Sequence, residues 1–142
     1  MKITRVEKQK VASFLPLPLF TTSVPAGFPS PADDYIESSL DLNDYLISHP
    51  SSTYFARAAG DSMVERGILD KALLIVDRAI EPRQGQVVIA AINGELTCKV
   101  LDIQNKQLLA ANPAYAPIII NEDSELVIEG VVIHAINTLC TP

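Results

Sequence analysis

The sequence predicts a mainly β domain preceded by an extended N-terminal arm, and three observations support this fold class. Residues beyond position 53 form short apolar runs rich in Val, Ile, Leu and Thr, which are separated by turn residues and are too short for helices. Asn93-Gly94 lies between two of these runs and favours a tight hairpin, because both turn positions need a positive φ. The chain has 142 residues, 48% of them hydrophobic, so one core can form without a metal or disulfide.

The predicted arm, residues 1–26, differs from the rest of the chain in charge. It carries a net charge of +3, whereas residues 27–142 carry −9 and the whole chain −6. No charged side chain lies between Lys10 and Asp33, and five of the ten prolines fall there, which favours extended chain over a membrane-spanning helix. We interpret 27–40 as an extended linker and 41–142 as the folded domain. The acidic balance also argues against direct binding to nucleic acid.

A secretory leader is the alternative interpretation of the arm. A basic start, the apolar run Val11–Phe20 and small residues before Gly27 are typical of a leader. Glu7 in the basic part and two prolines within the apolar run oppose it. We therefore expect a cytoplasmic protein. Both interpretations place a cut at the Ala26-Gly27 bond.

The folded domain is predicted to begin with a short helix, followed by strands. Asp41 is a good N-cap and Leu42, Tyr45 and Leu46 share one face, which predicts a helix over 42–48 that ends before Pro50. The apolar runs then predict a mostly antiparallel arrangement of strands over Thr53–Ala58, Ala72–Asp77, Gln86–Ile92, Glu95–Ile103, Gln107–Ala111 and Leu126–Ile136.

Ser62 follows the first of these strands in the segment Ala59-Gly60-Asp61-Ser62-Met63. With Glu65 three residues later it fits a capping box, and Gly67 would end a one-turn helix. A serine at a helix start also lies beside free backbone N–H groups, here those of Ser62 and Met63, which can receive an oxyanion. Ser62 is therefore a candidate both for a helix cap and for a nucleophile.

A nucleophilic serine needs a base, and Lys99 is the more unusual candidate. His49 precedes a proline at a helix end, and His134 lies in an apolar run, so neither is a good base. Period-two alternation places Lys99 on one strand face with Thr97 and Leu101. If that face is covered, the ammonium holds its proton less tightly and the amine can act as a general base. The alternative is an edge-strand lysine with its ammonium in water.

These motifs carry a resemblance to a known family. Gly60-Asp61-Ser62-Met63 followed by the Thr97-Cys98-Lys99 strand resembles the Ser-Lys self-cleaving domains of LexA-type repressors and UmuD-type polymerase accessory proteins, and the UmuD-type branch most closely. The resemblance covers nearly the whole chain. It implies a β-clip-like peptidase domain of antiparallel sheets with one or two short helices. Further similar stretches are Leu19-Phe20, Gly27–Tyr35, Asp41-Leu42-Asn43, His49-Pro50-Ser51, Thr53-Tyr54-Phe55, Leu74–Asp77, Val88–Ala91 and Gly130–His134.

The resemblance implies a serine endopeptidase that needs no cofactor and no metal. Ser62 would be the nucleophile, Lys99 the general base, and Ala26-Gly27 the bond cut, because the family cleaves Cys-Gly or Ala-Gly. RecA filaments on single-stranded DNA would stimulate this self-cleavage. The processed homodimer would then join a UmuC-type subunit for error-prone translesion synthesis in the SOS response.

The resemblance also assigns a partner to the arm. Leu17-Pro18-Leu19-Phe20 is similar to the segment through which uncut family members contact the sliding clamp. The alternative is an apolar arm that packs on the domain.

Other function classes remain or are excluded. Only 26 proline-interrupted residues precede Gly27, too few for a three-helix DNA-binding module, so we expect no repressor. The lack of an anchoring helix likewise argues against a membrane-bound signal peptidase. A secreted β domain and a non-catalytic binding module of the same fold remain as alternatives. The sequence assigns no role to Cys98 or Cys140.

Overall fold

The computed structural model describes residues 1–8, 14–20 and 36–141. It divides the chain into two compact units, Met1–Gln9 with His49–Pro142, and Lys10–Ser48. The predicted mainly β fold is confirmed. The predicted domain boundary at 26/27, with the Ala26-Gly27 bond, lies outside the described residues and stays a prediction. The strands are β1 (Lys2–Lys8), β2 (Pro16–Phe20), β3 (Ile36–Asp41), β4 (Thr53–Ala59), β5 (Leu73–Asp77), β6 (Val87–Ile92), β7 (Glu95–Asp102), β8 (Gln107–Leu109), β9 (Ile118–Ile119) and β10 (Leu126–Ile136).

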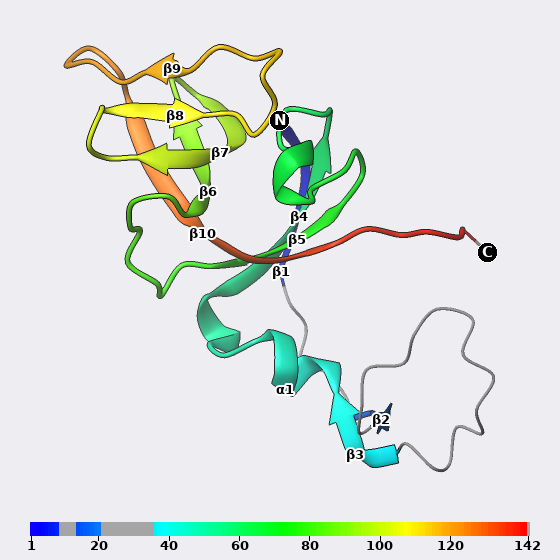
Figure 1. Cartoon of the computed structure of the whole chain (residues 1–142). Coiled ribbons are helices and arrows are strands. Elements are labelled where there is room, and N and C mark those ends of the chain that lie inside the picture. The colour runs from blue at the N-terminus through cyan, green and yellow to red at the C-terminus, as the bar shows by residue number, and fades with distance from the viewer. Residues whose placement is uncertain (9–13, 21–35, 142) are drawn as a thin grey trace. The chain divides into compact units, whose positions relative to one another are not determined.

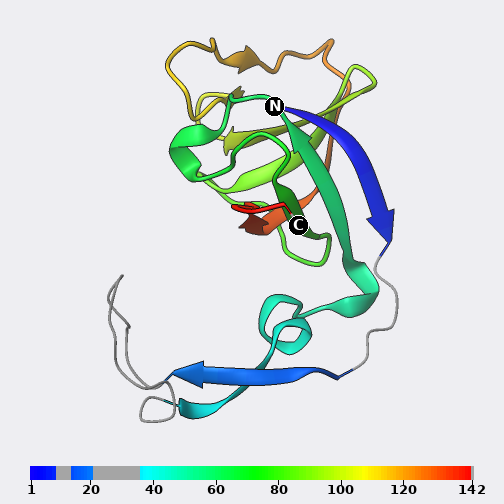
Figure 2. The ribbon, with the colours of Figure 1, turned by 90° about the vertical axis from the view of Figure 1, so that its right-hand side faces the viewer.

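The larger unit is built on one antiparallel sheet of eight strands that closes on itself. The order is β1-β4-β5-β10-β6-β7-β8-β9, and an extra pairing of Lys2 with Thr97 joins β1 to β7. Six strands therefore form a barrel, and the long β10 curves through it between β5 and β6 (Figure 1). Figure 2 shows the blue β1 running beside the green β4, whose edge it covers.

The barrel strands that the sequence predicts are present because their apolar side chains fill two core clusters. Four consecutive residues are buried on β5 and three on β6, as expected for strands covered on both faces. One cluster includes Leu74, Val76 and Ile89, and the other includes Val88 and Leu108. The predicted Asn93-Gly94 hairpin is confirmed, with φ of 50° and 84° at its two central residues.

The smaller unit contains the hairpin-like pair β2–β3 and the helix α1 (Leu42–Leu46). The helix ends two residues before the predicted Ser48, because Ile47 is already extended with φ −123° and ψ 107°. Asp41 is the N-cap residue of α1, as predicted, but its side chain makes no capping hydrogen bond. Asp41 is the last residue of β3, and its carboxylate accepts a hydrogen bond from the Leu15 N–H at 3.5 Å instead.

Two single-turn 3₁₀ helices, η2 (Pro50–Ser52) and η3 (Val64–Arg66), flank β4. His49 precedes η2, and its ring nitrogen Nδ1 lies 2.6 Å from the buried Asp77 carboxylate. Burial alone raises the pKa of Asp77, but hydrogen bonds from His49, the Ala79 N–H and Ser52 outweigh it and lower that pKa below its ordinary value. The contact of His49 with Asp77 therefore links the segment before β4 to the end of β5.

Gly130 lies at the irregular pairing of β10 with β6, where the barrel leaves no room for a side chain. A Cβ at this position would lie 2.6 Å from Cγ1 of Val76 and 3.3 Å from the carbonyl oxygen of Asp77, at a φ of +151°. Gly67 is the matched control, because its φ is +77° but nothing lies within 4 Å of its added Cβ. We expect Gly67→Ala to lower the free energy of unfolding by about 1–2 kcal/mol. Gly130→Ala should cost roughly 1–3 kcal/mol more, because overpacking adds to the strain.

Urea denaturation of the two glycine variants measures this difference. Equal losses in the free energy of unfolding would contradict a close contact between β10 and β5.

Candidate functional site

Ser62 is fixed by the loop that leaves β4. Gly60 turns the chain with φ +99°, and its N–H donates to the Asp70 carboxylate at 2.8 Å. The Ser62 carbonyl accepts from the Ala111 N–H at 2.8 Å, while the Glu65 N–H donates to the Ala111 carbonyl at 2.9 Å. These bonds tie the serine backbone to the segment after β8. The Ser62 side chain is fully buried.

Lys99 reaches Ser62 from the neighbouring part of the barrel. It lies on β7 opposite Val88 of β6, and β8 covers the other side of β7. The edge-strand alternative is therefore wrong, and Lys99 is only 5% exposed. Its ammonium donates a hydrogen bond to Ser62 Oγ, with 2.8 Å between the two atoms. Two residues 37 positions apart thus form a buried pair.

The capping-box interpretation of Ser62 is also wrong. The N-cap position of η3 is Met63, and no side-chain hydrogen bond caps this helix. The hydroxyl of Ser62 faces Lys99 instead. The predicted stop is correct, because Gly67 ends η3 with a left-handed φ of 77°.

The first residue of the chain contacts this pair as well. The Met1 amino group donates a hydrogen bond to Ser62 Oγ, and the Met1 carbonyl accepts from the Cys98 N–H and from Thr97 Oγ1, both at 2.9 Å. Burial first, and then the hydrogen bond and positive charge of Lys99, lower the pKa of this amino group to about 5. The Met1 side chain is 7% exposed and belongs to the larger core cluster.

A second group of polar side chains, which the sequence analysis did not find, borders the pair. The Tyr115 hydroxyl donates to the Asp61 carboxylate, and Asn112 Nδ2 donates to the Asp61 carbonyl at 2.9 Å. The Tyr115 ring centre lies 5.9 Å from Lys99 Nζ. The hydrogen bond to Asp61 is the largest cause that raises the pKa of Tyr115 above its ordinary value. Asn112 and Tyr115 sit in a loop, where no periodicity marks them.

The two cysteines differ in surroundings. Cys98 is fully buried next to Lys99, and burial raises the pKa of its thiol to about 12. Cys140 is exposed. Within residues 1–8, 14–20 and 36–141, no group of three or more His, Cys, Asp and Glu side chains could hold a metal ion.

The remaining predicted residues belong to the smaller unit or lie outside the described ranges. The Ala26-Gly27 bond is among the latter. Leu17, Pro18, Leu19 and Phe20 lie on β2, where Leu17 is 54% and Leu19 41% exposed. No helix in the described part of the chain is long and apolar enough to cross a membrane.

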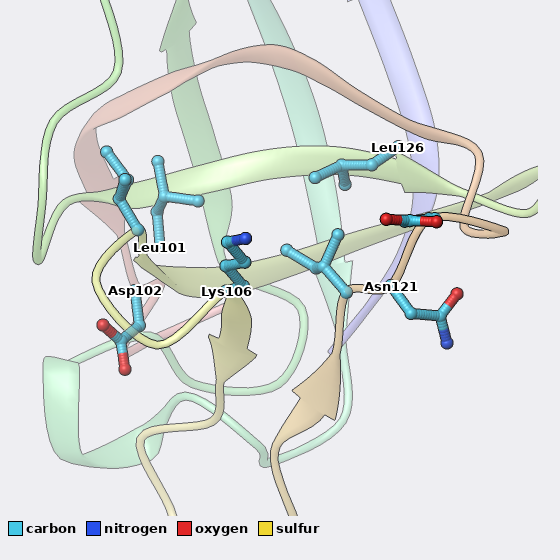
Figure 3. A pocket seen from close by; sticks show the side chains of 8 residues that line it. Leu101, Asp102, Lys106, Asn121 and Leu126 are labelled. Atoms are coloured by element: carbon cyan, nitrogen blue, oxygen red, sulfur yellow. The ribbon is translucent and has the colours of Figure 1, made fainter.

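A separate cavity of about 500 Å³ lies where β7 turns into β8. Figure 3 shows its lining side chains, which include Leu101, Lys106 and Leu126, and none belongs to the Ser62–Lys99 pair. The lining is mostly apolar, with Asp102 at one end held by Gln84, Asn105 and Gln107. These three hydrogen bonds lower the pKa of Asp102, with Gln107 the largest cause. The Asp102 carboxylate thus stabilises the turn between β7 and β8.

Comparisons with known proteins place this geometry in context. The sequence profile of the family described as Peptidase S24-like matches residues 18–133. Protein SamA of Salmonella typhimurium is 53% identical over 81% of this chain and 81% of its own length. Protein MucA of Escherichia coli is 36% identical over 96% and 94%. LexA repressor 1 of Pseudomonas syringae is 43% identical over 80% of this chain, which spans 57% of that repressor's length.

Proposed function

Because the chain belongs to the Peptidase S24-like family, whose members are serine peptidases, we propose that it cuts its own Ala26-Gly27 bond through Ser62 and Lys99. The observation that carries the proposal is the buried hydrogen bond of 2.8 Å between Lys99 Nζ and Ser62 Oγ. A hydroxyl and an amine at this distance satisfy the geometric requirement for a nucleophile and its base.

The proposed reaction begins when Lys99 has lost its extra proton. The neutral amine takes the hydroxyl proton of Ser62, and Oγ attacks the carbonyl carbon of Ala26. Lys99 then passes this proton to the Gly27 nitrogen as the peptide bond breaks, which leaves an ester between Ser62 and Ala26. Water, deprotonated by Lys99, hydrolyses that ester and restores the serine.

The oxyanion of the tetrahedral intermediate is assigned to the backbone N–H groups of Ser62 and Met63. Within the described residues neither group donates a hydrogen bond to another protein atom, so both are free to receive the negative charge. Both precede η3 directly in the chain.

Self-cleavage of this kind would serve the SOS response in the cytoplasm. The similarity to SamA and MucA over most of their lengths and to a LexA repressor supports a damage-linked role. We propose that RecA filaments on single-stranded DNA stimulate the cut. The processed homodimer, residues 27–142, then associates with a UmuC-type polymerase subunit for translesion synthesis. In the uncut chain, the exposed Leu17 and Leu19 on β2 support a contact with the sliding clamp.

The test is an intact-mass measurement on the purified chain, incubated with RecA, a nucleotide and single-stranded DNA. We expect release of residues 1–26 and a product that begins at Gly27. Ser62→Ala should abolish this product, because it removes the hydroxyl that attacks the Ala26 carbonyl carbon. An unchanged mass under activating conditions would contradict the proposal. Cutting that persists in Ser62→Ala would indicate a contaminating peptidase.

A further inference from the structure

Strand β1 begins directly after Met1, the residue whose nitrogen contacts Ser62 Oγ. It runs antiparallel to β4, with Lys2 opposite Ala59, Ile3 opposite Ala58 and Val6 opposite Ala56. On its other side, Lys2 pairs with Thr97 of β7, and Met1, the residue before β1, contacts Thr97 and Cys98. The start of the chain thus fills the gap between the end of β4 and the middle of β7.

Met1 makes the contacts that an extended substrate needs at this gap. Its carbonyl accepts hydrogen bonds from Cys98 and Thr97 on β7, its side chain lies in the core, and its nitrogen contacts Ser62 Oγ. With Met1 in place, Ser62 is fully buried and Lys99 is 5% exposed.

While Met1 contacts Ser62 Oγ, a substrate peptide bond cannot reach that oxygen. For attack, the carbonyl carbon of the bond must come to about 3–3.5 Å from the serine oxygen, in line with its lone pair. The Met1 nitrogen already occupies a hydrogen-bonding position on that oxygen. A second main chain cannot share the space, because interiors are close-packed.

We propose that β1 keeps the uncut chain inactive by filling the position between the edges of β4 and β7, which we call the groove, and that β1 must leave before Ala26-Gly27 can enter. This inference rests on the proposed self-cleavage and names the element that regulates it. The groove accepts an extended peptide that pairs antiparallel with β4 and gives one carbonyl to β7. Such strand addition at a sheet edge is a common way to bind peptides.

The test weakens β1 without touching Ser62 or Lys99. Ile3 is half-buried against the larger core cluster, so Ile3→Asp should release the strand. Thr4→Asp is the matched control, because it adds the same charge to the same strand at an exposed position, at the loss of the exposed 3.3 Å hydrogen bond from Thr4 Oγ1 to the Arg57 carbonyl. We measure self-cleavage of full-length chains at pH 9 without RecA, by intact mass. Ile3→Asp should cut about tenfold faster than the unchanged chain, because the fraction of chains with β1 released rises. Thr4→Asp should cut at the rate of the unchanged chain.

A peptide of residues 1–8 separates release of β1 from general loosening of the fold. Added to the Ile3→Asp chain, this peptide should suppress cutting, whereas the same peptide with Ile3→Asp should not. Equal rates in all three chains, or no suppression by the peptide, would overturn the inference and leave self-cleavage intact. If no chain cuts, even with RecA, self-cleavage itself fails and the inference fails with it.

Discussion

A chain with Lys99→Ala is expected to self-cleave at least about 100-fold more slowly than the unchanged chain, which is the low end of what a positioned general base contributes. Without the amine, the Met1 nitrogen is the only group among the described residues within hydrogen-bonding reach of the Ser62 hydroxyl, and the substrate must displace it. The measurement is the initial rate of product formation by intact mass, with and without RecA.

Lys99→Arg is the informative companion variant. The guanidinium keeps the positive charge and the hydrogen-bond donors, but it does not lose its proton in proteins. If lysine acts as the base, the arginine chain should be as slow as the alanine chain. A rate in Lys99→Arg close to that of the unchanged chain would show that only the positive charge matters. Thermal unfolding of both variants checks that the barrel is intact.

Self-cleavage without RecA is expected to accelerate as the pH rises from 7 to 10, by at most about tenfold per pH unit. The direction follows from the mechanism, because only the neutral amine of Lys99 can take the serine proton, and alkaline solution increases the neutral fraction. The measurement is the rate at each pH, with circular dichroism to confirm that the fold persists. A flat profile would argue against lysine as the base.

Three neighbours of the pair do not account for such a rise. While β1 is in place, the Met1 amino group, with a pKa of about 5, is uncharged from pH 7 upward. Release of β1 restores an ordinary amine, whose protonation favours release at lower pH and so opposes a rise in rate with pH. The Cys98 thiol, with a pKa of about 12, stays protonated up to pH 10. The hydrogen bond to Asp61 raises the pKa of Tyr115, so deprotonation of the phenol is shifted to higher pH. A rise in rate over this range is the result expected if Lys99 is the general base.

The strands β4 to β8 and β10 were predictable because their signal is local. Each apolar run between Thr53 and Ile136 carries its own turn residues, and only β9, two residues long, gives no signal. Strand β1 was missed for a physical reason. Its register shifts between Ile3 and Arg5, so its apolar residues Ile3 and Val6 are three positions apart and the period of two is lost.

The site was less predictable, because its contacts join distant parts of the chain. Spacing alone gave Ser62 two interpretations, and the capping box failed because its hydroxyl partner is on β7 rather than three residues away. Similarly, no local pattern shows whether Lys99 lies at an edge, since that depends on β8 folding back beside β7. Pairing the two residues required the family resemblance.

The Ser62–Lys99 hydrogen bond already exists in the uncut chain, before any activator binds. An activator has no chemical group left to align, so under the proposed function it acts on a conformational equilibrium of the substrate segment. The observed rate is then the rate of the chemical step multiplied by the population of chains with that segment in the groove. Raising this population from about 1% to nearly all chains gives roughly a hundredfold faster cut while the barrier of the bond-breaking step is unchanged.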